Sequence, residues 1–541
     1  MDKTKTVLLV ILIMAIAVFL RVWHLNSIPP GVYPDEAMNG NNAIQAIKTN
    51  DYKVYYPENN GREGLFINLE ALSFKIFGIH VWSLKLISVL AGILAVLGLY
   101  FLTKKLFQSI NIALLAMFFM TVSFWHINFS RIAFRAIMVP FLLVWSFYFL
   151  FKVMNFPPEK RKRFSSTLYL ILSGILLGLG FHTYIAFRMS VIILMVPLLV
   201  IVLKFFKEYK ISGGLFNTFF KNGFWQYKIW AFAIILAALP IGLYFLHNPQ
   251  DFIGRASGIS VLAQKNPLKA VIESTIKTLG MFNVVGDKNW RHNFSGSPQL
   301  YWPVGILFLI GIISSIKEFF KSLKTKTESW GIHLFLFVWF GVMLLPAILT
   351  AEALPHALRT IGVIPVCYIY AAWGGWIFYK FLAKGVNKKL LVIASLVFLI
   401  LCAYIGFDKY FVDWARQPVV EYAFAKDFVD MGKYLNQLPP EVSSYVIVNQ
   451  SGVLVPVLQN GKIKDIPMPA QTIIFIRAMN NENRTTIYLP HEEIDSIQAK
   501  GKLVIIPLQY DAGIFKKLKE KYPQGNVTQK ENFWVFELNV K

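Results

Sequence analysis

The sequence predicts a polytopic α-helical membrane protein of about eleven transmembrane helices, followed by a soluble α/β domain. Three observations support this prediction. The chain has 541 residues, of which 56% are hydrophobic and only 16% are charged. Its apolar residues recur in runs of about 20, the length that a helix needs to cross a bilayer. From residue 408 onward, short apolar runs alternate with helical stretches, which is typical of a soluble α/β domain.

Eleven apolar runs form the predicted spans. The first run, 7–23, follows Lys3 and Lys5, and no small-residue cleavage site comes after it, so we expect a retained anchor rather than a signal peptide. Cys367 and Cys402 both fall inside predicted spans, which excludes a disulfide framework and a thiolate metal site. The predicted spans are 7–23, 81–102, 111–129, 136–153, 167–184, 187–203, 229–246, 301–316, 331–350, 359–379 and 390–407.

The connections between these runs alternate in charge. Every second connection is rich in lysine, and the others are acidic or mixed. Short cytoplasmic connections carry an excess of lysine and arginine. We therefore expect a protein of the cell membrane with a cytoplasmic N-terminus and with everything after Phe407 outside. The same placement accounts for the net charge of +24, so we expect membrane lipids as partners and no nucleic acid.

Residues 1–407 are the predicted transmembrane domain, and residues 408–541 are the predicted extracytoplasmic domain. Two outer loops are long, at 24–80 and 247–300. The first holds amphipathic stretches near 37–48 and 65–77 that we expect to lie in the membrane interface, and the second, rich in Asn, Gly and Ser, is expected to be partly mobile. In the C-terminal domain the predicted helices are 421–438 and 514–521, and the predicted strands are 445–448, 472–476, 502–507 and 534–539.

Two carboxylates stand in the outer loop just past the first span, in the sequence Tyr33-Pro34-Asp35-Glu36-Ala37. Ionisable groups near lipid are costly to hold there and often functional. The alternative is local: Asp35 as the N-cap of the following helix, with Glu36 in its first turn. The sequence around Asp35 leaves both interpretations open.

Basic residues mark three other outer turns close to the membrane. In 128–135, spacings of three and four place Arg131 and Arg135 on one helical face, where two guanidiniums suit the oxygens of a phosphate. The turns 181–188 and 352–359 each carry a histidine and an arginine. For any single arginine, snorkelling to lipid headgroups is the simpler explanation. The candidate anion ligands in these turns are Arg131, Arg135, Arg188, His356 and Arg359.

A carboxylate together with arginines at the depth of lipid headgroups suits transfer of a group from a lipid phosphate. A sugar joined to a polyprenyl phosphate carries its leaving group at the membrane surface, and the acceptor hydroxyl arrives from water. A carboxylate takes the proton of that hydroxyl as it attacks the anomeric carbon. The departing lipid phosphate then needs cations or a metal ion. A single displacement of this kind inverts the anomeric centre.

The Tyr-Pro-Asp-Glu-Ala loop, the arginine-bearing turn and the Pro-His-Ala-Leu-Arg turn resemble those of the GT-C membrane glycosyltransferases. The resemblance covers the whole chain and is nearest to glycosyltransferase family 39, which includes protein O-mannosyltransferases and lipid A aminoarabinose transferases. It implies that Asp35 is the catalytic aspartate. The segment Gly61–Phe66 stands where these relatives carry a basic residue, two prolines and leucine; the prolines are absent here, and the resemblance implies that Arg62 is a donor-phosphate ligand.

These observations together predict an inverting glycosyltransferase with Asp35 as base and Glu36 as its support. The donor is a polyprenyl-phosphate-linked sugar, and the acceptor is a protein, lipid or glycan. The sequence establishes no cofactor. The candidate is a divalent cation, Mg²⁺ or Mn²⁺, which Asp35 and Glu36 would hold. The rival is a polytopic transporter or lipid flippase, although such proteins usually show repeated halves and broken mid-membrane helices. A third option is an inactive binding or scaffold protein.

Overall fold

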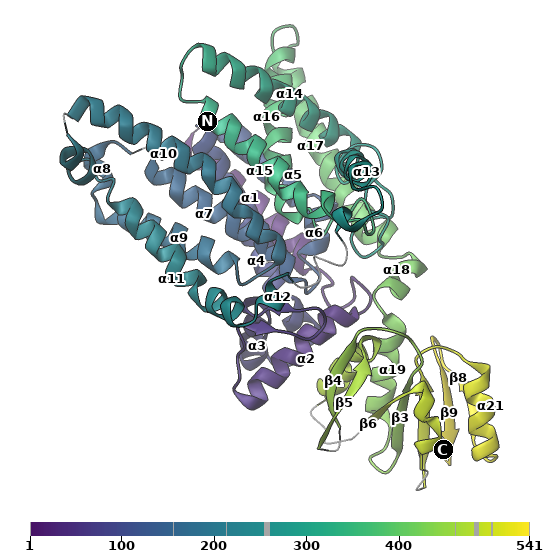
Figure 1. Ribbon diagram of the computed structural model, residues 1–541. Coiled ribbons are helices and arrows are strands. Elements are labelled where there is room, and N and C mark those ends of the chain that lie inside the picture. Colours follow the sequence, from purple (N-terminus) through teal and green to yellow (C-terminus); the bar gives the residue numbers. More distant parts are fainter. Residues whose placement is uncertain are drawn as a thin grey trace. The chain divides into compact units, whose positions relative to one another are not determined.

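The computed structural model of the chain describes residues 2–154, 156–212, 214–253, 260–459, 461–480, 486–498 and 501–539. It forms two compact units, each built from segments that are far apart in the sequence (Figure 1). The first unit comprises Met1–Trp23, Glu63–Phe66 and Ser88–Trp414, and the second comprises His24–Arg62, Ile67–Ile87 and Ala415–Lys541. The division differs from the predicted domains, because most of the outer loop 24–80 groups with the C-terminal residues.

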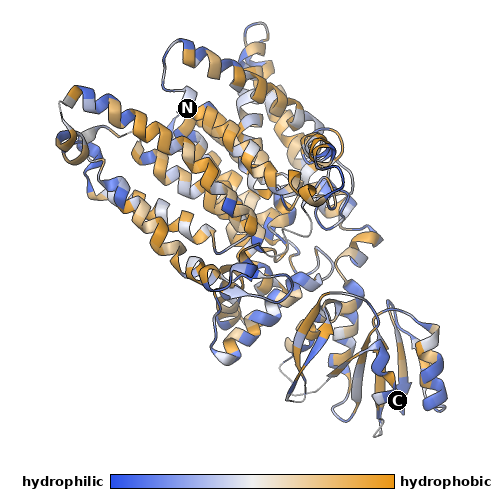
Figure 2. Ribbon diagram, in the orientation of Figure 1, coloured by the Kyte–Doolittle hydropathy of each residue, from blue (hydrophilic) through white to orange (hydrophobic). Residues whose placement is uncertain are grey.

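The first unit is a bundle of long helices that are apolar along most of their length (Figure 2). Among the described residues, nine helical segments are long and apolar enough to cross a membrane. Two shorter apolar helices, α5 (Ile110–Thr121) and α9 (Phe164–Gly180), coincide with the other two predicted spans. The polytopic helical fold is therefore confirmed. The nine segments are α1 (Lys3–Val22), α4 (Val81–Phe107), η1 with α7 (Arg135–Ile137, Met138–Met154), η2 with α10 (Ile185–Met189, Ser190–Ser212), α11 (Gln226–His247), α14 (Trp302–Lys324), α15 (Trp330–Ile348), η6 with α16 (Ile361–Val363, Ile364–Leu382) and α17 with η7 (Lys388–Phe407, Asp408–Trp414).

Glycines let some of these helices approach closely. A Cβ on Gly311 of α14 would lie 1.9 Å from the Tyr370 carbonyl oxygen of α16, and one on Gly374 of α16 would lie 1.9 Å from the Leu307 carbonyl oxygen of α14. Such distances are impossible for any side chain, so the two helices need glycine at their crossing. Small residues play this role widely in membrane bundles, where lipid removes the hydrophobic drive for association.

The third predicted span, 111–129, is broken. Helix α5 ends at Thr121, and the Ser123 hydroxyl accepts a hydrogen bond from His126 N at 3.2 Å, which caps the short α6 (Phe124–Phe129). Arg131 follows the end of α6, whereas Arg135 begins η1. The prediction that these two arginines share one helical face is therefore wrong, because no continuous helix joins them.

Short elements complete the first unit. The long loop 247–300 contains the 14-residue helix α13 (Pro267–Gly280), and residues 254–259 of that loop lie outside the described part. The remaining short elements are α8 (Pro158–Arg161), η3 (Asn217–Lys221), α12 (Pro249–Ile253) and η5 (Val261–Ala263). The two residues of β2 (Arg62–Glu63) are divided between the units, Arg62 in the second and Glu63 in the first.

The second unit contains a five-stranded sheet in the order β6-β3-β7-β9-β8. Strand β3 is parallel to β6 and β7, and β9 is antiparallel to β7 and β8. This confirms a C-terminal domain built on a sheet. Its strands are β3 (Ser443–Val448), β6 (Thr486–Pro490), β7 (Leu503–Pro507), β8 (Asn526–Gln529) and β9 (Trp534–Leu538), beside the pair β4 (Leu454–Gln459) and β5 (Lys462–Pro467) and the short β1 (Tyr55–Tyr56).

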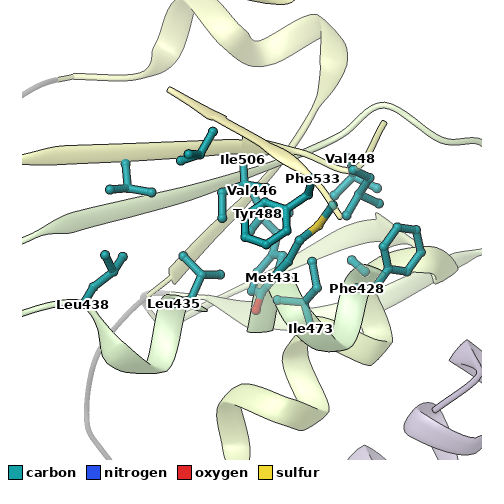
Figure 3. Close-up of a cluster of buried hydrophobic side chains, with 14 of the residues drawn as sticks. Phe428, Met431, Leu435, Leu438, Val446, Val448, Ile473, Tyr488, Ile506 and Phe533 are labelled. Atoms are coloured by element: carbon teal, nitrogen blue, oxygen red, sulfur yellow. The ribbon is translucent and has the colours of Figure 1, made fainter. Parts of the chain in front are cut away.

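Helices cover both faces of this sheet. Alternate residues of the strands, such as Val446 and Ile506, form one core with α19 (Lys426–Gln437) and α20 (Gln471–Ala478) (Figure 3). The intervening residues, such as Ile447 and Ile505, form a second core with η9 (His491–Ser496) and α21 (Ala512–Lys521). Burial on both faces explains why β7 and residues 445–448 of β3 are continuously apolar in the sequence.

Two predictions for this domain need correction. The segment 472–476 is not a strand but lies in α20, which packs against both α19 and α2 (Pro34–Thr49). A short helix buried on several sides is apolar nearly all round, so its sequence cannot be told from that of a buried strand. The predicted helix 421–438 is interrupted between α18 (Pro418–Ala423) and α19 by Ala425, whose φ is 54°.

The amphipathic stretches predicted in the first outer loop are helices. They are α2 and α3 (Leu65–Phe77). Leu72 and Ile76 of α3 are 51% and 62% exposed, which gives the helix an uncovered apolar side.

Candidate active site

Asp35 lies inside the first turn of α2 and does not cap it. The helix begins at Pro34, and its N-cap residue is Tyr33. Glu36 completes the cap, because its Oε1 accepts a hydrogen bond from Tyr33 N at 3.2 Å. Asp35 Oδ1 instead accepts a bond from Asn59 Nδ2 at 2.7 Å. The alternative that Asp35 is the N-cap is therefore wrong, because Tyr33 is the N-cap residue of this helix.

Arg62 is buried in the second unit and held by α2. Its Nη1 donates to Asn39 Oδ1 at 2.8 Å and its Nη2 to Asn42 Oδ1 at 2.6 Å. Glu58 lies 3.8 Å from Nη2 as its carboxylate partner. The guanidinium is thus fixed in position by two amides and one acid, all from the same unit.

Glu70 of α3 is a buried acid that the sequence prediction did not use. It is fully buried, and neither of its carboxyl oxygens has a hydrogen-bond partner among the described residues. Burial raises the pKa of Glu70 well above its usual value; the nearby Glu36 carboxylate raises it further, and Arg62 opposes the shift. Burial therefore favours the neutral, protonated form of Glu70 over its carboxylate.

In the first unit, Arg135 and Arg188 converge on one carboxylate. Arg135 Nε lies 3.3 Å from Glu63 Oε2, and Arg188 Nη2 lies 3.3 Å from Glu63 Oε1. The glutamate side chain is 3% exposed, while the arginine side chains are 19% and 16% exposed. The accessible part of the group is therefore the two guanidiniums. We call Glu63, Arg135 and Arg188 the arginine pair site.

Two short 3₁₀ turns position this site. Arg135 starts η1, which leads into α7, and Arg188 lies in η2, which leads into α10. The Arg188 guanidinium also donates to the Phe252 carbonyl oxygen at 2.6 Å and lies 4.5 Å from the Phe252 ring centroid. Both arginines thus sit at the same kind of place, the first turn of a membrane span.

Arg131 belongs to the core of the fold instead. It is completely buried, its Nη1 donates to the Leu20 carbonyl oxygen at 3.0 Å, and its Nη2 donates to the Trp23 carbonyl oxygen at 2.7 Å. Its guanidinium lies over the rings of Tyr410 and Phe411, at 5.7 and 5.0 Å from their centroids. These contacts tie the end of α1 to the turn after α6.

The turn 352–359 divides its predicted residues between two partners. Arg359 folds back on its own turn, with Nη2 3.3 Å from Glu352 Oε2. His356 joins Asp287 and His292 in a buried group whose ligand atoms all lie within 4.8 Å of one another. Among the described residues, this is the one place where at least three side chains of the types that bind metal ions come together. It contains neither Asp35 nor Glu36.

Four acidic or histidine residues of these groups were missed as site residues: Glu63, Glu70, Asp287 and His292. Glu63 stands beside the predicted ligand Arg62, and Asp287 and His292 lie five residues apart in a polar loop. These local signals are weak, because isolated acids and histidines in outer loops are common.

Comparisons with known proteins agree with this architecture. A family model described as dolichyl-phosphate-mannose-protein mannosyltransferase matches residues 66–246. No curated protein matches the chain by sequence. Among solved structures, ArnT from Cupriavidus metallidurans bound to undecaprenyl phosphate matches with a TM-score of 0.57 and 11% identity, over 100% of this chain and 99% of that one.

A second structural relative comes from an archaeon. The oligosaccharyltransferase AglB from Archaeoglobus fulgidus, in complex with an inhibitory peptide and a dolichol-phosphate, matches with a TM-score of 0.52 and 14% identity, over 100% of this chain and 74% of that one. The family model matches only a part of the chain, and the two solved structures show that the chain shares its fold with ArnT and AglB.

Proposed function

We propose that the protein transfers a sugar from a polyprenyl-phosphate donor to an acceptor hydroxyl at the outer membrane face, with inversion at the anomeric carbon. Asp35 is the general base, and Arg135 and Arg188 bind the donor phosphate. The observation that carries the proposal is the arginine pair site, where two partly exposed guanidiniums from different spans meet at one buried carboxylate.

The chemistry of this site suits a lipid phosphate better than a structural ion pair. Both guanidiniums lie in the first turn of a span and are partly exposed, whereas the carboxylate of Glu63 is buried. Arginine binds phosphate oxygens through a planar fork of donors. Glu63 orients both forks and prevents them from turning toward lipid headgroups elsewhere. The related ArnT and AglB structures contain lipid phosphates, which supports a polyprenyl-phosphate donor here.

The proposed reaction breaks the bond between the anomeric carbon and the phosphate oxygen of the donor. The acceptor oxygen forms the new bond and passes its proton to Asp35. The lipid phosphate leaves with the bonding electron pair, and its added negative charge is stabilised by Arg135 and Arg188. Glu36 supports the loop through its bond to Tyr33 N. The transferred sugar is a hexose or a pentose.

Substitution of the two arginines tests the proposal. A charge-assisted phosphate contact is worth about 1.5–3 kcal/mol, so Arg135→Ala or Arg188→Ala should raise the donor KM about tenfold to a hundredfold. The matched control is Arg163→Ala, which removes an exposed arginine from a lysine-rich connection. The measurement is sugar transfer by purified protein over a range of donor concentrations. An unchanged donor KM in the double variant would contradict the phosphate role.

A further inference from the structure

A buried group of three metal-ligating side chains joins two outer connections of the first unit. Asp287 Oδ2 lies 3.0 Å from His292 Nδ1 and 3.9 Å from His356 Nδ1. The two imidazole rings are 4.9 Å apart at an interplanar angle of 33°. The exposed fractions of the side chains are 4% for Asp287, 6% for His292 and 11% for His356. The group is nearly closed, and His356 is the most exposed of its three side chains.

The surroundings hold the carboxylate of Asp287 in one orientation. Its Oδ1 accepts a hydrogen bond from Asn289 N at 2.8 Å, and its Oδ2 accepts one from Ala357 N at 2.8 Å. Asn293 Nδ2 closes the turn by donating to the carbonyl oxygens of Asp287 and Ser297. Metal ligands in proteins are usually oriented in this way by a second set of hydrogen bonds.

The distances fit a tetrahedral ion after small movements. Bonds of about 2.0–2.1 Å to nitrogen and oxygen at tetrahedral angles place two ligand atoms about 3.3–3.4 Å apart. The observed separations from Asp287 Oδ2, 3.0 Å to His292 and 3.9 Å to His356, lie on either side of this value. To reach the tetrahedral spacing, His292 Nδ1 must move away from Asp287 Oδ2 and His356 Nδ1 must move toward it, each by roughly half an ångström.

We propose that Asp287, His292 and His356 bind a zinc ion. Two imidazole nitrogens with one carboxylate oxygen are a ligand set that zinc favours, whereas Mg²⁺ and Ca²⁺ require mainly oxygen ligands. The ion takes the place of the proton between His292 Nδ1 and Asp287 Oδ2, and in a neutral imidazole that proton moves to Nε2. One carboxylate balances half of the charge of the ion, and a water molecule entering beside His356 completes four ligands.

The ion would fasten the connection around 287–292 to the turn that carries His356, two segments that are distant in sequence. This site differs from the pair Asp35 and Glu36, which offers only oxygen ligands. The proposal does not depend on sugar transfer, because it concerns binding of the metal alone. Without a metal, the same residues form a hydrogen-bonded group around Asp287, and the experiment must separate these two cases.

The test is titration of the untagged, chelator-treated full-length protein in detergent with Co²⁺, whose visible absorption reports tetrahedral coordination, followed by displacement with Zn²⁺. We expect saturation at one equivalent and a higher melting temperature with Zn²⁺.

Two variants remove one ligand each. His356→Gln keeps the hydrogen bond between Asp287 and His292, and Asp287→Asn keeps an oxygen that can accept the hydrogen bond from Ala357 N. Since loss of an outer-shell partner already weakens binding about tenfold to a hundredfold, each variant should weaken it at least about a hundredfold.

The matched control is His247→Gln, which removes an exposed histidine of the same unit at the end of α11. It should bind Co²⁺ like the wild type. Melting curves without metal establish that each variant is folded. Absence of a saturable equivalent in the wild type, or equal affinity in His356→Gln and His247→Gln, would overturn the proposal and leave Asp287 as a purely hydrogen-bonding residue.

Discussion

Replacing Asp35 with asparagine separates a catalytic carboxylate from a structural one. Asparagine has the same shape and keeps one carbonyl oxygen, but it cannot accept a proton at neutral pH. In the structure Asp35 Oδ1 accepts a hydrogen bond from Asn59 Nδ2 at 2.7 Å, and the asparagine oxygen can accept the same bond. The substitution therefore removes the charge and the basicity while leaving the local contacts in place.

The cost in stability is small by this reasoning. Exchanging a charged acceptor for a neutral one in the bond to Asn59 costs about 1 kcal/mol. Loss of a negative charge from the first turn of α2 costs at most about 1 kcal/mol more. The free energy of unfolding should fall by about 1–2 kcal/mol. Loss of a general base slows a reaction about 10²–10⁴-fold, which corresponds to about 3–5 kcal/mol of activation free energy. The loss of rate should thus exceed the loss of stability.

The assay is sugar transfer from a polyprenyl-phosphate donor by purified protein, measured beside a melting curve. The matched control is Asp51→Asn, which removes an exposed carboxylate two residues beyond the end of α2. It should retain wild-type turnover. Asp35→Asn should lose at least about a hundredfold in turnover with a melting temperature close to that of the wild type.

Turnover of Asp35→Asn within a few-fold of the wild type would refute the assignment of Asp35 as base. Glu36→Gln would then be the next substitution to measure. A large loss of turnover together with a collapsed melting curve would instead show that the stability estimate is wrong, and the role of Asp35 would have to be tested by rescue with an added carboxylate such as formate.

Three further outcomes are expected. Arg131→Ala should lower the melting temperature by several degrees, because the carbonyl groups of Leu20 and Trp23 lose a buried donor; an unchanged melt with a raised donor KM would return Arg131 to the phosphate site. For Glu70 the raised pKa means that the folded state binds the proton more tightly than the unfolded state, so stability should fall as pH rises through the folded-state pKa. Glu70→Gln should remove this dependence, and parallel curves of melting temperature against pH for variant and wild type would contradict it. For topology, cysteine at Leu458, which is 73% exposed, should be labelled from outside intact cells and cysteine at Lys162 should not; the reverse pattern would place the C-terminal domain in the cytoplasm.

The sequence by itself determined the positions of the membrane spans and several elements of the C-terminal domain. A run of about 20 apolar residues needs a helix in lipid whatever its neighbours are, because backbone groups there must bond within the segment. Strand β7 and residues 445–448 of β3 could also be predicted, because burial on both faces of the sheet makes them continuously apolar. The prediction that Asp35 is a site residue also came from the sequence, since an acid beside a span is costly and therefore conspicuous.

Only the tertiary structure decided how the ionisable residues pair. Arg131 and Arg135 look alike in the sequence, yet one donates to backbone carbonyls in the core and the other binds Glu63. The segment 472–476 is apolar enough for a strand, but contacts with α2 and α19 make it a helix. Asp287 and His356 meet although 68 residues of chain separate them. Which side chains pair depends on the distances between them in the folded chain. The order of residues in the sequence does not give those distances.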